Sequence, residues 1–254
     1  MVHDTTVSET INRIIYAFEK KEAVLGILLV GSYAYGNAKE DSDIDIRIIY
    51  GASTVKRDKG LLNINGYMVS YLGNPITETY QLFYEQLKMH SRFQARMIAR
   101  GKILLDKTGE IAHLQREAQV YMERDFPLPS QSAMQMEVYD LWKYKEELLK
   151  EHPSGYPVMM YYYLFLQKAF NWYSKFLGKE CVFQHTFFKL HTYLSDPGFR
   201  ERFVIDEFPD THFGSLFLEA MQSDERTIKH FTERIWDCID GCANVNFESL
   251  LIEE

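Results

Sequence analysis

Cysteines and long apolar runs are scarce in this sequence, and their scarcity excludes two classes of protein. Three cysteines among 254 residues, an odd number, do not form a disulfide framework. No apolar run approaches the roughly 20 residues that span a bilayer. Residues 1–6 also lack the basic segment and apolar core of a secretory signal. We therefore expect a cytoplasmic protein with no membrane partner.

Positive charge is also in short supply. The chain has 28 Lys and Arg against 36 Asp and Glu, a net charge of −8. The overall field therefore does not draw the protein to nucleic acid, which is disfavoured as a partner. The hydrophobic share of 46% and charged share of 25% are typical of a globular protein and exclude wholesale disorder.

Two halves of the chain differ in their periodicity. The first half predicts helices alternating with strands, with Ser8 as an N-cap, Pro75 opening a helix and a turn-rich stretch at 51–66. Two prolines within residues 126–130 mark a boundary, after which the pattern is helical only. The expected helices are 8–22, 76–100, 108–124, 131–152, 157–177, 183–194, 213–222 and 224–242, and the expected strands are 24–30, 43–50, 67–72 and 102–106. The fold class is thus α+β, with domains at 1–125 and 131–254.

The most informative segment begins where the first buried strand ends, at Gly31-Ser32, and includes Gly36. At Gly31 a side chain would obstruct both a sharp turn and a closely approaching phosphate. Ser32 offers a hydroxyl at the start of a short helix, whose free N–H groups favour an anion. These residues predict a phosphate-binding turn.

Two carboxylates follow in Ser42-Asp43-Ile44-Asp45. Asp43 and Asp45 are two positions apart on a predicted strand, so both point to one face of the sheet. Adjacent like charges are unfavourable unless a cation lies between them, and Mg²⁺ often bridges carboxylates to substrate phosphates. A phosphate-binding turn beside such a pair predicts phosphoryl or nucleotidyl transfer, in which two metal ions could steady the attacking and leaving oxygens.

Gly31-Ser32, Gly36 and Ser42-Asp43-Ile44-Asp45-Ile46 together resemble the signature of the DNA polymerase β-type nucleotidyltransferase superfamily, which includes kanamycin-type and lincosamide-type antibiotic nucleotidyltransferases and minimal nucleotidyltransferases. The resemblance covers about residues 8–125 and implies a small mixed β-sheet followed by a helical-bundle domain. It also implies that Gly31, Ser32, Gly36 and Ser42 bind the triphosphate of an NTP, and that Asp43 and Asp45 hold magnesium ions and are catalytic.

The sequence departs from that superfamily in one respect. The superfamily has a third carboxylate on a following strand, but the matching stretch here, residues 66–72, contains neither Asp nor Glu. Ser70 or Asn65 could contact a metal weakly, although neither is a good general base. Alternatively, Asp58, Glu78 or Asp106 approaches in space, the acceptor domain supplies a base, or the site binds nucleotide without transferring it.

The resulting expectation is a Mg²⁺-dependent nucleotidyltransferase that moves an NMP from an NTP to a hydroxyl of a small, aminoglycoside-like acceptor and releases pyrophosphate. The alternatives are a catalytically silent nucleotide-binding or antitoxin-like protein and an enzyme that modifies proteins. A homodimer that builds one cleft from two subunits is possible for an enzyme of this kind.

Other charged and aromatic residues favour structural interpretations. Arg92, Arg96 and Arg100 share one helix face, which we expect to be solvated, and Arg47 is expected to pair structurally with a carboxylate. Core packing is the expected role of the aromatic helix at 157–177, although some rings could line a cleft. We expect Lys56, Arg57 and Lys59 to be exposed loop charges, and Cys238 and Cys242 to be buried thiols. His185 and His191 are six positions apart and do not form a metal-binding pair. A surface helix face is expected for Glu137, Asp140, Glu146 and Glu147.

Overall fold

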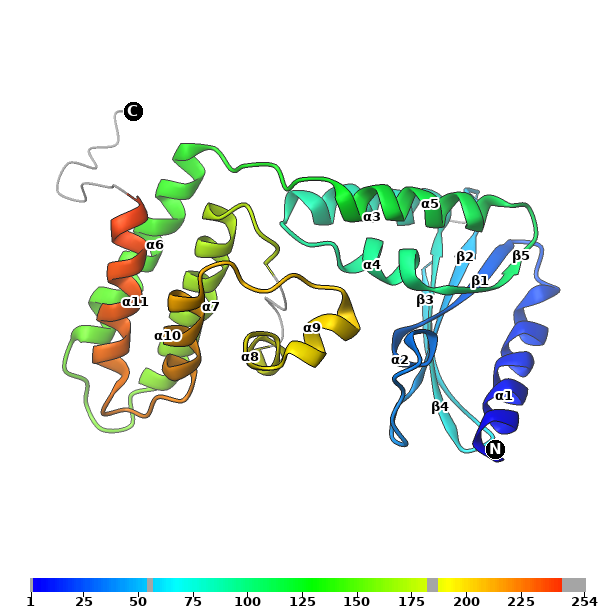
Figure 1. The fold of residues 1–254 in the computed structure, drawn as a ribbon, viewed down its shortest axis with the longest axis horizontal. Helices are drawn as coiled ribbons and strands as arrows, with labels where there is room; N and C mark the ends of the chain where they lie inside the picture. The colour runs from blue at the N-terminus through cyan, green and yellow to red at the C-terminus, as the bar shows by residue number, and fades with distance from the viewer. Residues whose placement is uncertain (1, 54–56, 182–186, 244–254) are drawn as a thin grey trace. The chain divides into compact units, whose positions relative to one another are not determined.

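The computed structural model describes residues 2–53, 57–181 and 187–243. The chain divides into two compact units, residues 1–125 and 126–254. Among the described residues, the strands all lie in the first unit, and the second unit contains helices without strands (Figure 1). The α+β class expected from the sequence is therefore confirmed.

A five-stranded mixed sheet forms the centre of the first unit. Its strands lie in the order β3-β4-β2-β1-β5, and β2 and β4 are parallel while the other neighbouring pairs are antiparallel. The register places Asp45 of β2 opposite Val30 on one side and Ser70 on the other. The strands are β1 (Val24–Val30), β2 (Ile44–Tyr50), β3 (Asp58–Ile64), β4 (Tyr67–Pro75) and β5 (Lys102–Asp106).

Helices cover both faces of this sheet (Figure 1). On one face, Ile44, Ile46 and Ile48 of β2 pack with Ile14 and Phe18 of α1 (Val2–Glu19). On the other face, Leu28, Val30 and Ile49 pack with side chains of α3 (Ile76–Lys88), α4 (Phe93–Arg100) and α5 (Glu110–Glu123). Because side chains alternate along a strand, Asp45 lies on the second face, with Ile49.

The structure corrects three expectations in this unit. The helix expected from Ser8 begins at Val2, because the apolar spacing continues upstream through Val7, which packs against the sheet. The helix expected over 76–100 is broken into α3 and α4 at His90, which is 1% exposed and has a φ of 53°. The turn-rich stretch expected at 51–66 contains strand β3.

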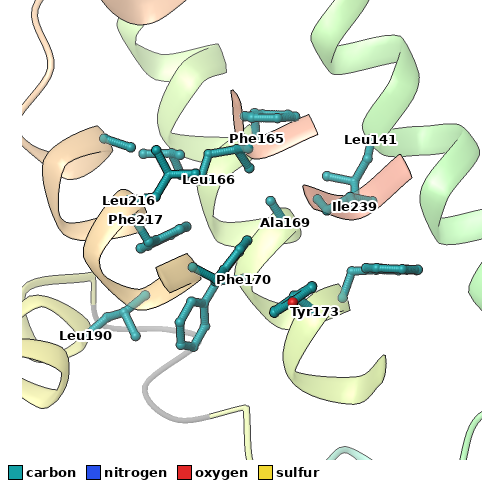
Figure 2. Packing of buried hydrophobic residues seen from close by; sticks show 14 of the residues in the cluster. Leu141, Phe165, Leu166, Ala169, Phe170, Tyr173, Leu190, Leu216, Phe217 and Ile239 are labelled. Atoms are coloured by element: carbon teal, nitrogen blue, oxygen red, sulfur yellow. The ribbon is translucent and has the colours of Figure 1, made fainter. Parts of the chain in front are cut away.

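The described residues of the second unit contain six helices, and Figure 2 shows residues of α7 at the centre of their core. Core packing of its aromatic residues is confirmed: Tyr162, Phe165, Phe170 and Trp172 are at most 2% exposed. The helix expected at 183–194 falls partly outside the described residues, and α9 is an addition. The helices are α6 (Gln131–Leu149), α7 (Val158–Phe176), α8 (Phe187–Ser195), α9 (Pro197–Phe203), α10 (Thr211–Met221) and α11 (Ile228–Ala243).

Candidate active site

Gly31 ends β1 in a conformation that requires glycine. Its φ is +68°, and it begins the five-residue helix α2 (Gly31–Tyr35). A Cβ at this position would overlap the Oδ2 atom of Asp45 and lie 3.2 Å from its Cγ. Two constraints therefore act together at Gly31, a left-handed backbone and the close approach of a carboxylate. The phosphate-binding turn predicted from the sequence lies directly against Asp45.

Gly36 and Ser42 shape the loop between α2 and β2. Gly36 has a φ of +74°, and its backbone N–H donates to the carbonyl oxygen of Ser32. No atom lies within 4 Å of a Cβ built on Gly36, so only the backbone conformation requires glycine there. The Ser42 hydroxyl accepts a hydrogen bond from the Lys39 N–H at 2.8 Å. In this structure Ser42 thus closes the turn that leads into Asp43.

The two aspartates of the motif differ in exposure. Asp43 directly precedes β2 and is exposed, whereas Asp45 lies within the strand and is half-buried. Between them, Ile44 is 0% exposed and anchors the strand in the core. The alternation of β2, continued to the residue just before the strand, puts Asp43 on the face of Asp45. This face bears the predicted metal ligands beside Gly31.

Ser70 is the neighbour of Asp45 on β4. The two residues are in register on parallel strands, and the Ser70 hydroxyl donates a hydrogen bond to Asp45 Oδ1 at 2.9 Å. A charge-assisted bond of this kind holds the carboxylate in one orientation. Ser70 thus occupies the position from which a side chain of the next strand reaches Asp45.

None of the other carboxylates proposed from the sequence joins this pair. Asp58 accepts a hydrogen bond from the Tyr50 hydroxyl at 2.9 Å, five positions along β2 from Asp45. Glu78 contacts Arg57 and Asn74. Asp106 lies opposite Gly26, at the other end of β1 from Val30, and accepts from backbone N–H groups that begin α5.

The remaining alternatives also leave the pair without a third acidic ligand. Asn65 donates to the Thr10 hydroxyl at 3.2 Å, on α1. Within the described ranges, no three His, Cys, Asp or Glu side chains are grouped so that they could hold a metal ion.

Burial raises the pKa of the Cys238 and Cys242 thiols, as expected for structural cysteines.

The arginines of α4 are buried or half-buried, contrary to the expectation of a solvated helix face. Arg96 is 7% exposed, and the guanidinium carbon of Arg100 lies 4.1 Å from the centre of the Tyr35 ring. Burial raises the pKa of Tyr35, while the charges of Arg100 and Arg96 oppose that rise. Arg92 donates to the carbonyl oxygen of Arg124 at 2.5 Å. The packing of α4 against α2 brings these side chains inward.

Arg47 follows Asp45 by two positions and therefore lies on the same face of β2. Its Nη2 donates to the sulfur of Met97 at 3.4 Å, a weak acceptor, and its buried Nε has no hydrogen-bond partner among the described residues. Burial lowers the pKa of Arg47, whereas the charge of Asp45 raises it. Arg47 therefore carries positive charge on the same side of the sheet as Asp45, and its buried Nε lacks a hydrogen-bond partner among the described residues.

The acidic residues of α6 do not form a free negative surface. Each has a lysine partner, which supports the expected surface helix face. The pairs are Glu137–Lys175 at 2.6 Å, Asp140–Lys143 at 2.8 Å, Glu146–Lys145 at 3.0 Å and Glu147–Lys150 at 2.7 Å. In the part of the chain that the structure describes, no helix is both long enough and apolar enough to cross a membrane.

Two comparisons with known proteins found similarities to this chain. Residues 12–110 match the family model described as polymerase beta, nucleotidyltransferase. The crystal structure of a nucleotidyltransferase-like protein from Exiguobacterium sibiricum 255-15 aligns with a TM-score of 0.49 and 12% identity, over 94% of this chain and 74% of that chain. No curated protein matches the chain. Residues 12–110 contain all five strands, Gly31-Ser32 and the two aspartates, and they form a nucleotidyltransferase domain of the polymerase β-type superfamily.

Proposed function

We propose that the first unit binds a nucleoside triphosphate with Mg²⁺ and transfers the NMP to a hydroxyl of a small-molecule acceptor. One observation carries the proposal: the Gly31 turn lies directly against Asp45, and Asp43 stands two positions earlier, just before the strand. Backbone groups at the turn suit phosphate oxygens, and paired carboxylates suit Mg²⁺. The five-residue length of α2 makes its N–H groups, rather than a long helix dipole, the relevant donors.

The donor set fits one magnesium ion. Asp43 and Asp45 offer carboxylate oxygens, and Mg²⁺ is commonly held by one or two carboxylates together with substrate phosphates. When bound, Mg²⁺ would neutralise phosphate charge at the reacting centre. Gly31 and Ser32 would hold the triphosphate, and Ser70 would fix the orientation of Asp45 through its 2.9 Å hydrogen bond.

The reaction follows from that placement. The acceptor oxygen would form a bond to the α-phosphorus, the bond from that phosphorus to the oxygen bridging to the β-phosphate would break, and pyrophosphate would leave. The acceptor proton would pass to solvent. Orientation of the triphosphate by fixed protein groups is a main source of rate acceleration in such displacements.

A second candidate function is favoured by a specific observation. The described residues place no third carboxylate near Asp45, where Ser70 donates a hydrogen bond instead. A chain with this site could bind the nucleotide without transferring it, as a sensor or antitoxin-like protein. Transfer to a protein side chain differs from the first proposal only in the acceptor.

Incubation of the purified protein with α-³²P-labelled NTPs, Mg²⁺ and pools of small hydroxyl compounds or proteins would separate these functions. The first proposal predicts label in a small molecule and release of pyrophosphate. It also predicts loss of both in Asp43→Asn, while Asp41→Asn, a substitution of an exposed neighbour, retains them. Label found only in protein would indicate a protein acceptor in place of a small molecule. NTP binding without transfer to any acceptor would favour the catalytically silent protein.

A further inference from the structure

The surroundings of Asp45 bear on how many cations the site can hold. Asp45 Oδ2 lies against Gly31, and Oδ1 accepts the hydrogen bond from Ser70. The Ser70 hydroxyl orients the carboxylate of Asp45 but adds no negative charge to the site. The strand register gives the next strand one side chain directly beside Asp45, and that side chain is neutral.

Fixed positive charge lies on the same side of the sheet. Arg47 lies two positions after Asp45 on the same face of β2, donates to the sulfur of Met97, and has a buried Nε without a hydrogen-bond partner among the described residues. Arg100 and Arg96 come from α4: the Arg100 guanidinium carbon lies 4.1 Å from the centre of the Tyr35 ring, and Arg96 is buried. Two carboxylates offset one divalent ion, and a second such ion would meet guanidinium charge without a further acidic ligand.

We propose that the site takes one divalent cation per chain and that Arg47 supplies fixed positive charge beside it. This inference rests on the proposed function, since it assumes that Asp43 and Asp45 hold the cation. Ser70 determines how many cations the site binds, because an additional carboxylate that held a second cation would stand at its position. A two-ion site needs ligands that bridge ions about 3.5–4 Å apart, and the described residues offer two carboxylates.

Electron paramagnetic resonance of Mn²⁺ tests the count directly. The full chain would be loaded with Mn²⁺ and inorganic tripolyphosphate. The triphosphate group is common to every NTP, so the result does not depend on which nucleobase the site accepts. One bound ion gives an isolated six-line signal, whereas two ions about 4 Å apart give a spin-coupled signal. Wild type, Ser70→Asp and Ser70→Ala would be compared, with thermal unfolding confirming that each variant is folded.

The proposal predicts an isolated signal and one ion per chain in wild type and Ser70→Ala, and a coupled pair in Ser70→Asp. A coupled pair in wild type would overturn it. One ion in all three proteins would overturn the assignment of Ser70 as the determinant. Absence of protein-bound Mn²⁺ in wild type, or binding that persists in Asp43→Asn/Asp45→Asn, would instead contradict the proposed function.

Discussion

Replacing Gly31 with alanine tests the close approach on which the candidate site is built. An L-residue at a φ of +68° costs about 1–2 kcal/mol. The added Cβ would also overlap Asp45 Oδ2, so the carboxylate must rotate and lose its hydrogen bond from Ser70. A hydrogen bond to a charged group contributes about 1.5–3 kcal/mol. We therefore expect Gly31→Ala to lower the free energy of unfolding of the first unit by about 2.5–5 kcal/mol.

Gly36→Ala is the matched control. Gly36 has a φ of +74° but open space around its Cβ position, so alanine should cost only the backbone term of about 1–2 kcal/mol. Gly66→Ala, at a φ of +84° and equally open, gives a second control. The difference between Gly31→Ala and these two variants isolates the overlap with Asp45.

Urea unfolding followed by two probes would measure these effects. All three tryptophans, Trp142, Trp172 and Trp236, lie in the second unit, so their fluorescence follows that unit. Far-ultraviolet circular dichroism follows both units. We expect Gly31→Ala to lower the urea midpoint of the first unit, which appears in circular dichroism, and to leave the midpoint followed by tryptophan fluorescence unchanged. Equal costs for Gly31→Ala and Gly36→Ala, within about 0.5 kcal/mol, would refute the reasoning.

Two further predictions concern stability. Burial opposes the ionisation of Asp106, but hydrogen bonds from the Ala112, Ile111 and Gly109 N–H groups outweigh it and lower its pKa. A lowered folded-state pKa contributes stability that is present above about pH 4 and lost as the pH falls through that pKa. Asp106→Asn should therefore have a lower free energy of unfolding than wild type in urea at pH 7, and the difference between the two proteins should narrow near pH 3. A difference that does not change with pH would contradict this. Trp172 is 2% exposed and its Nε1 donates to the Met134 carbonyl oxygen at 3.1 Å, so Trp172→Ala should destabilise the helical unit by about 3–5 kcal/mol. Fluorescence of the remaining tryptophans during urea unfolding measures that loss, and a cost below about 1 kcal/mol would place Trp172 outside the core.

Local patterns predicted the elements that position the candidate site. The apolar run of β1, Gly31 at its end and the Asp-Ile-Asp alternation each carry their structural meaning in a few consecutive residues. Strand β3 was missed because Lys59, Gly60 and Asn63 interrupt the apolar pattern of this edge strand. A signal was present, however: Asn65-Gly66, both at positive φ, joins β3 to β4 as a two-residue hairpin loop.

Features that depend on packing could not be predicted in this way. Nothing in the sequence around His90 resembles a helix stop, since neither glycine nor proline occurs between residues 76 and 100. The burial of Arg96 depends on how α4 packs against α2 and the sheet, which four-residue spacing does not reveal. Likewise, the hydrogen bond from Ser70 to Asp45 follows from the register of two parallel strands 25 positions apart in the sequence.

Calorimetric titration of the full chain with ATP, GTP, CTP and UTP, with and without Mg²⁺, tests the central claim most directly. The proteins compared would be wild type, Asp43→Asn/Asp45→Asn and Asp41→Asn. The account predicts that at least one NTP binds wild type and Asp41→Asn only with Mg²⁺, and that the double variant loses this binding at least tenfold. Absence of NTP binding, or equal binding by the double variant, would contradict the assignment of Gly31, Asp43 and Asp45 as a nucleotide and metal site.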